Sequence, residues 1–142
     1  MVSALNIFCI SFVASVGALK VTVAGGSGFV GSRVCKYLVE NGAEVTSVSK
    51  SGKAPDWAAG EAWTSKVNWK ANEMTRGSVA NLAEALGTPD ALVSCIGTVG
   101  FDRQGLLVGN GKTNADVAKA LASAGVSVKR CSYVSVLSLI HI

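Results

Sequence analysis

The stretch from residue 20 to residue 34, KVTVAGGSGFVGSRV, most limits how this chain can fold. Residues that favour β-strands lead into a cluster of glycines, and the glycines lead into a pattern with helical spacing. Gly25, Gly28 and Gly31 stand three residues apart at this junction and give G-x-x-G-x-x-G. A glycine turn between a strand and a helix opens a β-α-β unit, so the stretch predicts an α/β fold.

Each of the three glycines has a distinct chemical use in such a turn. Gly25 allows a tight turn, Gly28 lets backbone N–H groups approach a pyrophosphate, and Gly31 lets the helix pack closely on the strand. The N-terminus of the helix adds unpaired N–H groups and a dipole that favour an anion. We therefore predict that this turn binds a dinucleotide. A turn with a purely structural role is the alternative.

The alternation of strand and helix patterns continues along the chain. We expect strands at residues 20–24, 43–49, 66–70, 91–96 and 130–136, helices at 29–41, 78–86 and 113–124, and a polar loop at 50–65. Strands that alternate with helices form a parallel sheet with right-handed crossovers. The prediction is a Rossmann, doubly wound parallel sheet of order 3-2-1-4-5, incomplete at its C-terminus.

Helical spacing also predicts which side chains face the core. The residues expected to point inward are Val30, Val34 and Leu38 in the first helix, Val79, Leu82 and Leu86 in the second, and Val117 and Leu121 in the third.

Composition limits the function classes. With 142 residues, 49% of them hydrophobic and 15% charged, the chain has the composition of one globular domain. Its net charge of +4 comes from basic residues that are scattered singly, with Lys129-Arg130 as the one adjacent pair. Because no basic stripe with interleaved aromatics is present, we expect no nucleic-acid partner.

The cysteines and the histidine do not form a metal site. Cys35, Cys95 and Cys131 fall inside apolar helix or strand patterns and are expected to be buried thiols. No CxxC occurs, and His141 is the one histidine of the sequence. A zinc site therefore has no ligand set.

Residues 1–18, MVSALNIFCISFVASVGA, carry no charged side chain. Val16-Gly17-Ala18 resembles a signal-peptidase site, so we expect residues 1–19 to be a targeting or signal segment for an organelle (a plastid or mitochondrion among them) or the secretory route. A buried N-terminal helix or strand is the alternative. The missing basic n-region and the missing arginine fit neither a typical signal peptide nor a typical mitochondrial transit peptide.

A second glycine cluster, GLLVGNGKT at residues 105–113, resembles a phosphate-binding P-loop. The spacing fails, because the position that needs the first glycine is Leu106 and Gly105 is one residue too early. The cluster also follows the fourth strand. We therefore interpret it as a loop that leads into a helix.

The second predicted strand ends in SVSKSGKAP. An NAD-specific site usually places an acidic residue there to hold the ribose 2′-hydroxyl. This chain has Ser49, Lys50 and Ser51, and a lysine with two hydroxyls suits a 2′-phosphate. We predict that NADP(H) is preferred and that NAD(H) is the alternative cofactor. A solvated loop charge is the alternative interpretation of Lys50.

The sequence VAGGSGFVGSRVCKYLVENGAEVTSVSKSGKAP resembles the atypical and extended short-chain dehydrogenase/reductase superfamily, whose members are NAD-dependent epimerase/dehydratase-like proteins. Within it, the similarity is to the subgroup with the complex I accessory subunit of this fold, a fungal mitochondrial coenzyme Q biosynthesis protein and plant plastid relatives. The resemblance covers about residues 20–136.

This resemblance implies roles for individual residues. The pyrophosphate would be bound by Gly25, Ser27, Gly28, Phe29, Val30 and Gly31, and the adenosine ribose or its phosphate by Ser49, Lys50 and Ser51. The adenine would lie near Asn72-Glu73-Met74, where the family has a Gly-Asp-Leu-like turn, and the nicotinamide ribose near Ser94-Cys95-Ile96-Gly97. The departure at 72–74 leaves the adenine contact open.

The catalytic residues of the superfamily follow its fifth strand. Ser135 matches the catalytic serine, with a strand-end hydroxyl as the alternative. The tyrosine of the family's Tyr-x-x-x-Lys acts as the acid or base, and its lysine lowers the tyrosine pKa. Tyr133 is no substitute, because Leu137 stands four residues later. The pair is not present in this chain, nor is the substrate-binding part, so the chain is expected to be a fragment.

Two functions stay open at this point. The first is an NADP(H)-dependent oxidoreductase or epimerase-like enzyme, whose substrate the sequence does not identify. The second is a non-catalytic dinucleotide-binding module that stabilises a membrane-associated complex.

The last six residues, LSLIHI at 137–142, resemble the translation of a common sequencing adapter. We expect them to be an artefact that follows a partial NAD(P)-binding domain at 20–136, with a genuine apolar tail as the alternative.

Overall fold

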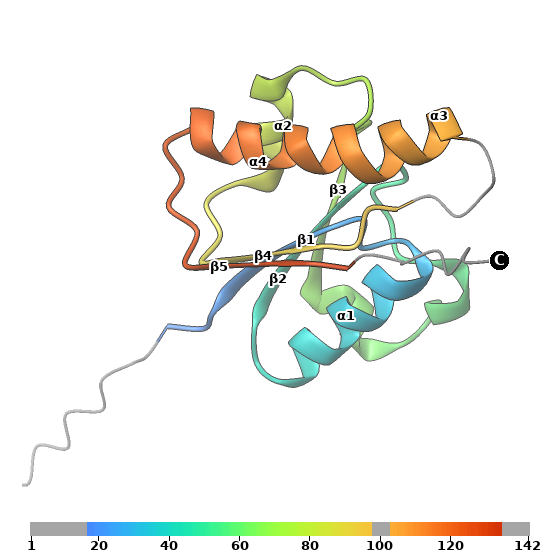
Figure 1. Cartoon of the computed structure of the whole chain (residues 1–142). Helices are drawn as coiled ribbons and strands as arrows, with labels where there is room; N and C mark the ends of the chain where they lie inside the picture. The colour runs from blue at the N-terminus through green and yellow to red at the C-terminus, as the bar shows by residue number, and fades with distance from the viewer. Residues whose placement is uncertain (1–16, 98–102, 135–142) are drawn as a thin grey trace, which may run out of the picture.

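The computed structural model describes residues 17–97 and 103–134 (Figure 1). Its elements, in chain order, are β1 (Lys20–Ala24), α1 (Phe29–Glu40), β2 (Glu44–Ser49), the 3-10 turns η1 (Asp56–Ala58) and η2 (Ala62–Lys66), β3 (Val67–Ala71), α2 (Val79–Leu86), β4 (Ala91–Ser94), α3 (Arg103–Leu106), the π-helical turn η3 (Leu107–Lys112), α4 (Thr113–Ser123) and β5 (Arg130–Tyr133).

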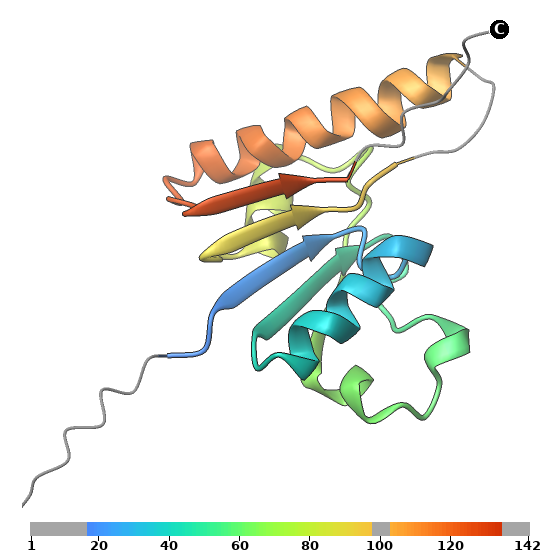
Figure 2. The ribbon, with the colours of Figure 1, turned by 60° about the horizontal axis from the view of Figure 1, so that its bottom comes forward.

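The strands form a parallel five-stranded sheet of order β3-β2-β1-β4-β5, which confirms the predicted Rossmann topology. The α1 helix covers one face of the sheet, and α2 and α4 cover the other (Figure 1). Ala24 at the end of β1 pairs with Val48 on one side and Ser94 on the other. From β1 the chain first adds β2 and β3 on one side and then adds β4 and β5 on the other side (Figure 2). Open α/β sheets bind their ligands at such a switch point, which here lies between β1 and β4.

The sheet separates two hydrophobic cores. The core on the α1 face contains Val21, Val23, Cys35, Val39, Val45, Ala58, Trp63 and Val67. The core on the other face contains Val48, Leu82, Leu86, Leu92, Val117, Ala120 and Leu121. Val45 and Val48 fall in different cores although both belong to β2, so this strand is buried on both faces, as central parallel strands are.

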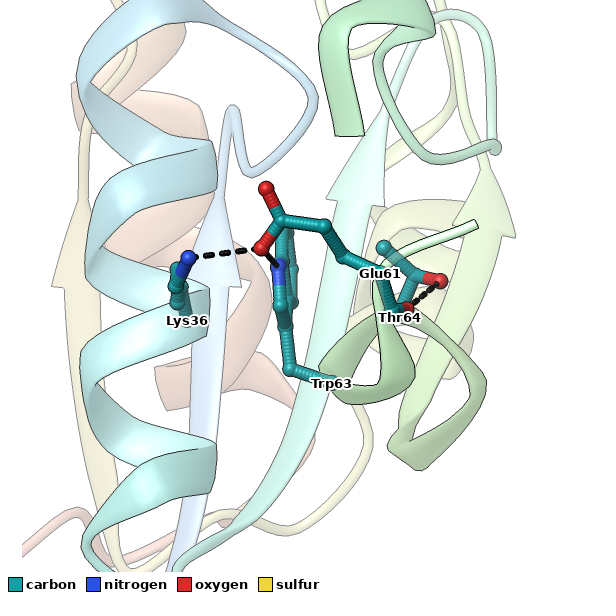
Figure 3. Close-up of polar contacts among 4 residues, drawn as sticks. All are labelled: Lys36, Glu61, Trp63 and Thr64. Atoms are coloured by element: carbon teal, nitrogen blue, oxygen red, sulfur yellow. Dashed lines mark hydrogen bonds and ion pairs between the residues drawn. The ribbon is translucent and has the colours of Figure 1, made fainter. Parts of the chain in front are cut away.

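A half-exposed ion pair joins the start of η2 to α1. Lys36 Nζ lies 2.6 Å from Glu61 Oε2, and the indole N–H of Trp63 donates to the same oxygen at 2.7 Å (Figure 3). Trp63 also packs against Trp57 and Trp69. The segment predicted as a plain loop at 50–65 therefore contains two helical turns that are anchored on the sheet and on α1.

The face that α1 turns to the sheet differs from the prediction. Gly31, Ser32, Cys35 and Val39 are buried, whereas Val30 is 42% exposed. The helix approaches β1 through Gly31, and this close contact rotates the glycine side of the helix inward. Val34 and Leu38, which were also predicted inward, lie half-buried at the flank of the core. In α2, Leu82 and Leu86 are buried as predicted, but Val79 at the first helical position is exposed.

The predicted loop at 105–112 is wrong. The segment 103–112 is helical and runs through the π-helical turn η3 directly into α4. Gly109 is buried in this turn, and the Thr113 hydroxyl donates to the Val108 carbonyl oxygen at 2.8 Å. The glycines of this stretch favour a loop, but its packing keeps it helical.

Strand β4 ends at Ser94, two residues earlier than predicted. β5 ends at Tyr133 and Val134 is not part of it, so the strand predicted to reach Val136 is shorter than expected; Val136 itself lies outside the described residues.

The three cysteines of the described residues differ in exposure. Cys35 is buried and Cys95 is half-buried. Cys131 is exposed because β5 lies at the edge of the sheet, so the prediction of a buried thiol is wrong for Cys131.

Over residues 17–97 and 103–134, no helix has the length and apolar character needed to cross a membrane. The same part of the chain contains no group of three or more His, Cys, Asp or Glu side chains that could hold a metal ion.

Candidate functional site

The glycine turn after β1 is built by close backbone approaches. Gly25 has φ of +83°, and a Cβ there would lie 2.9 Å from the Cys95 carbonyl oxygen. Its N–H donates to the Val48 carbonyl oxygen at 2.7 Å, and its own carbonyl accepts the Gly28 N–H at 3.0 Å. A side chain at Gly31 would overlap the Gly25 carbonyl. Gly25 therefore requires glycine for both conformation and space, and Gly31 requires it for space alone.

The N-terminus of α1 is open to a ligand. Its N-cap residue is Gly28, no side chain caps the first turn, and the first turn holds no acidic residue. The first backbone N–H groups of a helix have no partner within the helix and attract anions. The Phe29 and Val30 side chains are exposed, so these two residues can serve a ligand through their backbone N–H groups. The turn is thus free to receive an anion.

A hydroxyl pair ties the glycine turn to the loop after β2. Ser27 Oγ lies 2.7 Å from Ser49 Oγ and donates to the Lys53 carbonyl oxygen at 2.5 Å. Because the Ser27 proton goes to that carbonyl, the Ser49 hydroxyl must donate to Ser27. Ser49 Oγ in turn accepts the Gly52 N–H at 3.2 Å. The two hydroxyls thus fix the relative position of the two loops.

Gly52 supports Ser49 without lining the cavity, and sequence reasoning missed it. It has φ of +59°, and a Cβ would lie 2.5 Å from the Ala71 backbone nitrogen. The signal was available, because a glycine three residues after the end of β2 favours a turn with positive φ.

Lys50 is the cation at the end of β2. Its side chain is 83% exposed, and its Nζ lies 3.3 Å from Glu73 Oε2. A hydrogen bond from Thr75, and then the contact with Lys50, hold the pKa of Glu73 below its usual value. Exposed pairs of this kind contribute little free energy, so Lys50 can exchange the carboxylate for a ligand anion.

A cavity of about 650 Å³ joins these features. Its lining residues are Gly25, Ser27, Gly28, Ser49, Lys50, Ser51, Met74, Cys95, Ile96 and Gly97. All of them are among the predicted cofactor-binding residues. Four further predicted residues lie beside the cavity without lining it: Phe29, Val30 and Gly31 in the first turn of α1, and Glu73 in its pair with Lys50. Ser135 lies outside the described residues.

The wall of the cavity after β4 is held from two sides. The Cys95 N–H donates to the Ala24 carbonyl oxygen at 2.8 Å. On the other side, the Asn114 amide donates to the Ile96 carbonyl oxygen at 3.3 Å. Burial raises the pKa of the Cys95 thiol, so this wall carries no thiolate at neutral pH.

Sequence reasoning also missed Asn114. The sequence could have indicated it, because Asn114 lies on the same face of the predicted helix as Val117 and Leu121, which are both buried. A polar side chain at an inward position needs a hydrogen-bond partner, and here the partners are groups at the end of β4.

The geometry fits a dinucleotide. The uncapped helix N-terminus and the glycine turn stand in the middle of the cavity, as a pyrophosphate requires. The loops after β2 and β4 lie on either side of the turn, where the two nucleoside halves would extend. The volume lies within the usual range of cofactor pockets.

Comparison with known proteins agrees with this architecture. Residues 21–136 match the NAD dependent epimerase/dehydratase family. An uncharacterized chloroplastic protein of Arabidopsis thaliana is 38% identical over 117 residues, which are 82% of this chain and 37% of that protein. MIOREX complex component 2 of Saccharomyces cerevisiae is 42% identical over 57 residues, which are 39% of this chain and 21% of the yeast protein. The chain thus spans less than half the length of these relatives.

Solved structures share the fold. The Stenotrophomonas maltophila UDP-glucose-4-epimerase with bound NAD has a TM-score of 0.68 at 17% identity, and the match covers 85% of this chain and 38% of that one. The Bordetella bronchiseptica enzyme WbmG in complex with NAD has a TM-score of 0.66 at 19% identity, with the same coverage of 85% and 38%.

Proposed function

The chain belongs to the NAD-dependent epimerase/dehydratase family and forms its NAD-binding Rossmann domain, and on this premise we propose that it is the cofactor-binding part of an oxidoreductase or epimerase-like enzyme. The observation that carries the proposal is the uncapped N-terminus of α1, which opens into a cavity lined by the loops after β1, β2 and β4. The whole protein's substrate is not part of the proposal.

Different residues of the chain would bind different parts of the dinucleotide. The first turn of α1 and the backbone of the glycine turn would hold the pyrophosphate by N–H groups. Ser49 and Ser27 would keep the loop after β2 in place for the adenosine half. Ile96 and Gly97 would form the wall beside the other half. The bound nicotinamide would supply hydride transfer, and the chain would hold and orient it.

We propose further that NADP(H) is the preferred cofactor. The support is the absence of an acidic residue among Ser49, Lys50 and Ser51, together with the exposed Lys50 ammonium. Glu73 opposes this preference, because its carboxylate lies beside the same ammonium. A 2′-phosphate would therefore have to compete with Glu73 for Lys50, and NAD(H) is the competing cofactor.

A non-catalytic role is the second candidate. The observation that favours it is the similarity to a protein whose name places it in the MIOREX complex. In this version the chain binds a dinucleotide as a structural element of a membrane-associated assembly.

We also propose an organellar location for the chain, with residues 1–19 as the targeting segment. The support is the uncharged apolar composition of residues 1–18 and the chloroplastic relative. A fluorescent fusion of the whole chain should enter an organelle, and a fusion that starts at residue 20 should not. Equal distribution of the two fusions would contradict the proposal.

Two measurements test the proposed function. Calorimetric titration of the chain with NADP⁺ and with NAD⁺ should show saturable binding, tighter for NADP⁺. A chain that binds neither would refute dinucleotide binding. Oxidation of NADPH with a panel of carbonyl substrates, measured on the protein in its natural length, separates the two roles, since turnover counts against a purely structural cofactor.

A further inference from the structure

We infer that Asn114 is a positioning residue for the dinucleotide, because it fixes the cavity wall that receives the nicotinamide half. The inference rests on the proposed function. Asn114 lies in α4, on the face of the sheet opposite to the glycine turn's own helix, yet its side chain reaches the cavity wall after β4.

The Asn114 amide makes contacts with three separate groups. Its Oδ1 accepts a hydrogen bond from the Ser94 hydroxyl. Its Nδ2 donates to the Ile96 carbonyl oxygen at 3.3 Å and to the Asn110 carbonyl oxygen at 2.8 Å. One side chain thus links the end of β4, the cavity wall and the π-helical turn η3.

The orientation of this amide follows from its partners. Carbonyl oxygens only accept hydrogen bonds, so the NH₂ group must face Ile96 and Asn110. The remaining amide oxygen then faces Ser94, whose hydroxyl must be the donor. Both the oxygen and the NH₂ group of the amide are therefore engaged in hydrogen bonds. Neither a carboxylate nor an apolar side chain of similar size can form all of these bonds.

The surroundings make this link hard to replace. Ser94 is 4% exposed, and Val117 and Leu121 on the Asn114 side of α4 are also buried. Asn114 itself is half-buried, and with Ser94 it lines a second cavity of about 330 Å³, so the link is partly shielded from water. π-helical turns inside helices are often found at functional sites, and the Asn110 carbonyl belongs to one here.

The link acts on one half of the ligand. Strand order places β4 on one side of β1 and β2 on the other, so the wall at Ile96 and Gly97 lies across the pyrophosphate turn from Ser49 and Lys50. The adenosine half belongs to the β2 side, where the ribose is read in this type of fold. A loosened Ile96 carbonyl should therefore disturb the nicotinamide half and leave the adenosine half unaffected.

The test compares a whole ligand with half of one. NADP⁺ and adenosine 2′,5′-bisphosphate, which lacks the nicotinamide half, are titrated by calorimetry into the wild-type chain and into Asn114→Ala. We expect roughly tenfold weaker NADP⁺ binding, as for the loss of a part-buried hydrogen bond, and unchanged bisphosphate binding. Ser123→Ala is the matched control on the exposed side of the same helix, and it should change neither affinity.

Asn114→Asp gives a second, pH-dependent readout that does not depend on the alanine variant. The carboxylate would face two carbonyl oxygens, so NADP⁺ binding should be weak at pH 8. Protonation restores one donor, so affinity relative to wild type at the same pH should recover as the pH falls toward 5. Destabilisation of the whole fold by the carboxylate would also be relieved by protonation, so bisphosphate binding to this variant is measured at the same pH values and should stay at the wild-type level.

The outcomes are distinguishable. Equal loss of NADP⁺ and bisphosphate affinity, or no loss of either in both variants, would overturn the positioning role. If the wild-type chain bound the bisphosphate but showed no added affinity for NADP⁺, the inference would also be wrong. Failure of the wild-type chain to bind NAD⁺ as well as these two ligands would refute the proposed function itself.

Discussion

The α-carbon of Gly31 faces the carbonyl oxygen of Gly25, and a methyl group at Gly31 would overlap that oxygen. The contact joins α1 to the turn after β1 and sets how closely the helix lies on the sheet. It also accounts for the rotation of α1, because Cys35 and Val39 follow Gly31 on the same buried face. One backbone contact thus links the glycine spacing in the sequence to the position of the helix N-terminus.

The first prediction concerns this contact. Gly31→Ala should lower the free energy of unfolding by roughly 1–3 kcal/mol, because overpacking against backbone forces the helix away from β1. Chemical denaturation measures the change. Gly111→Ala is the control, since a Cβ there meets nothing within 4 Å, and it should be neutral or slightly stabilising. Equal destabilisation by the two variants would contradict the role of the contact.

The second prediction concerns Cys35. Burial, and to a lesser degree the nearby Cys95 thiol, raises the pKa of Cys35 to about 12. The unfolded chain ionises this thiol near its ordinary pKa of 9.0, so alkaline pH favours unfolding. Stability should therefore fall progressively from about pH 9 toward pH 12, and Cys35→Ser should flatten this part of the profile. A profile unchanged by the substitution would count against a buried neutral thiol.

The same burial predicts an order of chemical reactivity. Among the three cysteines of the described residues, peptide mapping after brief iodoacetamide treatment should show Cys131 modified first and Cys35 last, because Cys131 is exposed at the edge strand. Denaturant should abolish the difference. Early modification of Cys35 in the folded chain would show that α1 opens readily.

The third prediction concerns Lys50 and Glu73. Lys50→Asp should weaken NADP⁺ binding and leave NAD⁺ binding intact, whereas Glu73→Gln should strengthen NADP⁺ binding by freeing the Lys50 ammonium. Calorimetry at low salt measures both. Parallel changes in the two cofactors would refute the role assigned to Lys50 in cofactor choice.

The fourth prediction concerns the ion pair between α1 and η2. Contacts with Lys36 and with the Trp63 indole N–H hold the pKa of Glu61 below its usual value (Figure 3). A carboxyl whose pKa is lowered on folding contributes stability above its unfolded pKa, and this contribution is lost as pH falls through the folded pKa.

Glu61→Gln should therefore lower Tm at neutral pH and have progressively less effect below about pH 4. Asp56→Asn is the control, because the Asp56 side chain is 98% exposed in its pair with Lys53 and should contribute little. A Tm loss for Glu61→Gln that did not change with pH would point to packing at Trp63 in place of charge.

Much of this architecture could be predicted from the sequence because its signals are local. The glycine spacing and the end of β2 lie within short stretches, and they located the cavity lining at Gly25 to Gly28 and at Ser49 to Ser51, whereas Met74 and Cys95 to Gly97 were expected from the family resemblance. Strand order followed from the handedness of β-α-β crossovers.

The errors have tertiary causes. The buried face of α1 is set by contact between Gly31 and a carbonyl that precedes the helix, which helical periodicity does not contain. The helix at 103–112 forms although its glycines signal a loop, and Cys131 is exposed because its strand lies at the edge. Asn114 acquires its partners only when α4 packs beside β4.

The central claim is that the N-terminus of α1 binds the pyrophosphate of a dinucleotide, and Gly28→Asp tests it most directly. Aspartate is a favourable N-cap, and this offsets the tight contact of 3.2 Å that its Cβ would make with the Gly25 carbonyl oxygen, so the variant should keep a Tm close to that of wild type. Its carboxylate would occupy the anion position, so NADP⁺ affinity should fall by roughly a hundredfold or more. Gly28→Ser, an uncharged cap, should bind more tightly than the aspartate variant. Wild-type NADP⁺ affinity in a stably folded Gly28→Asp chain would contradict the account.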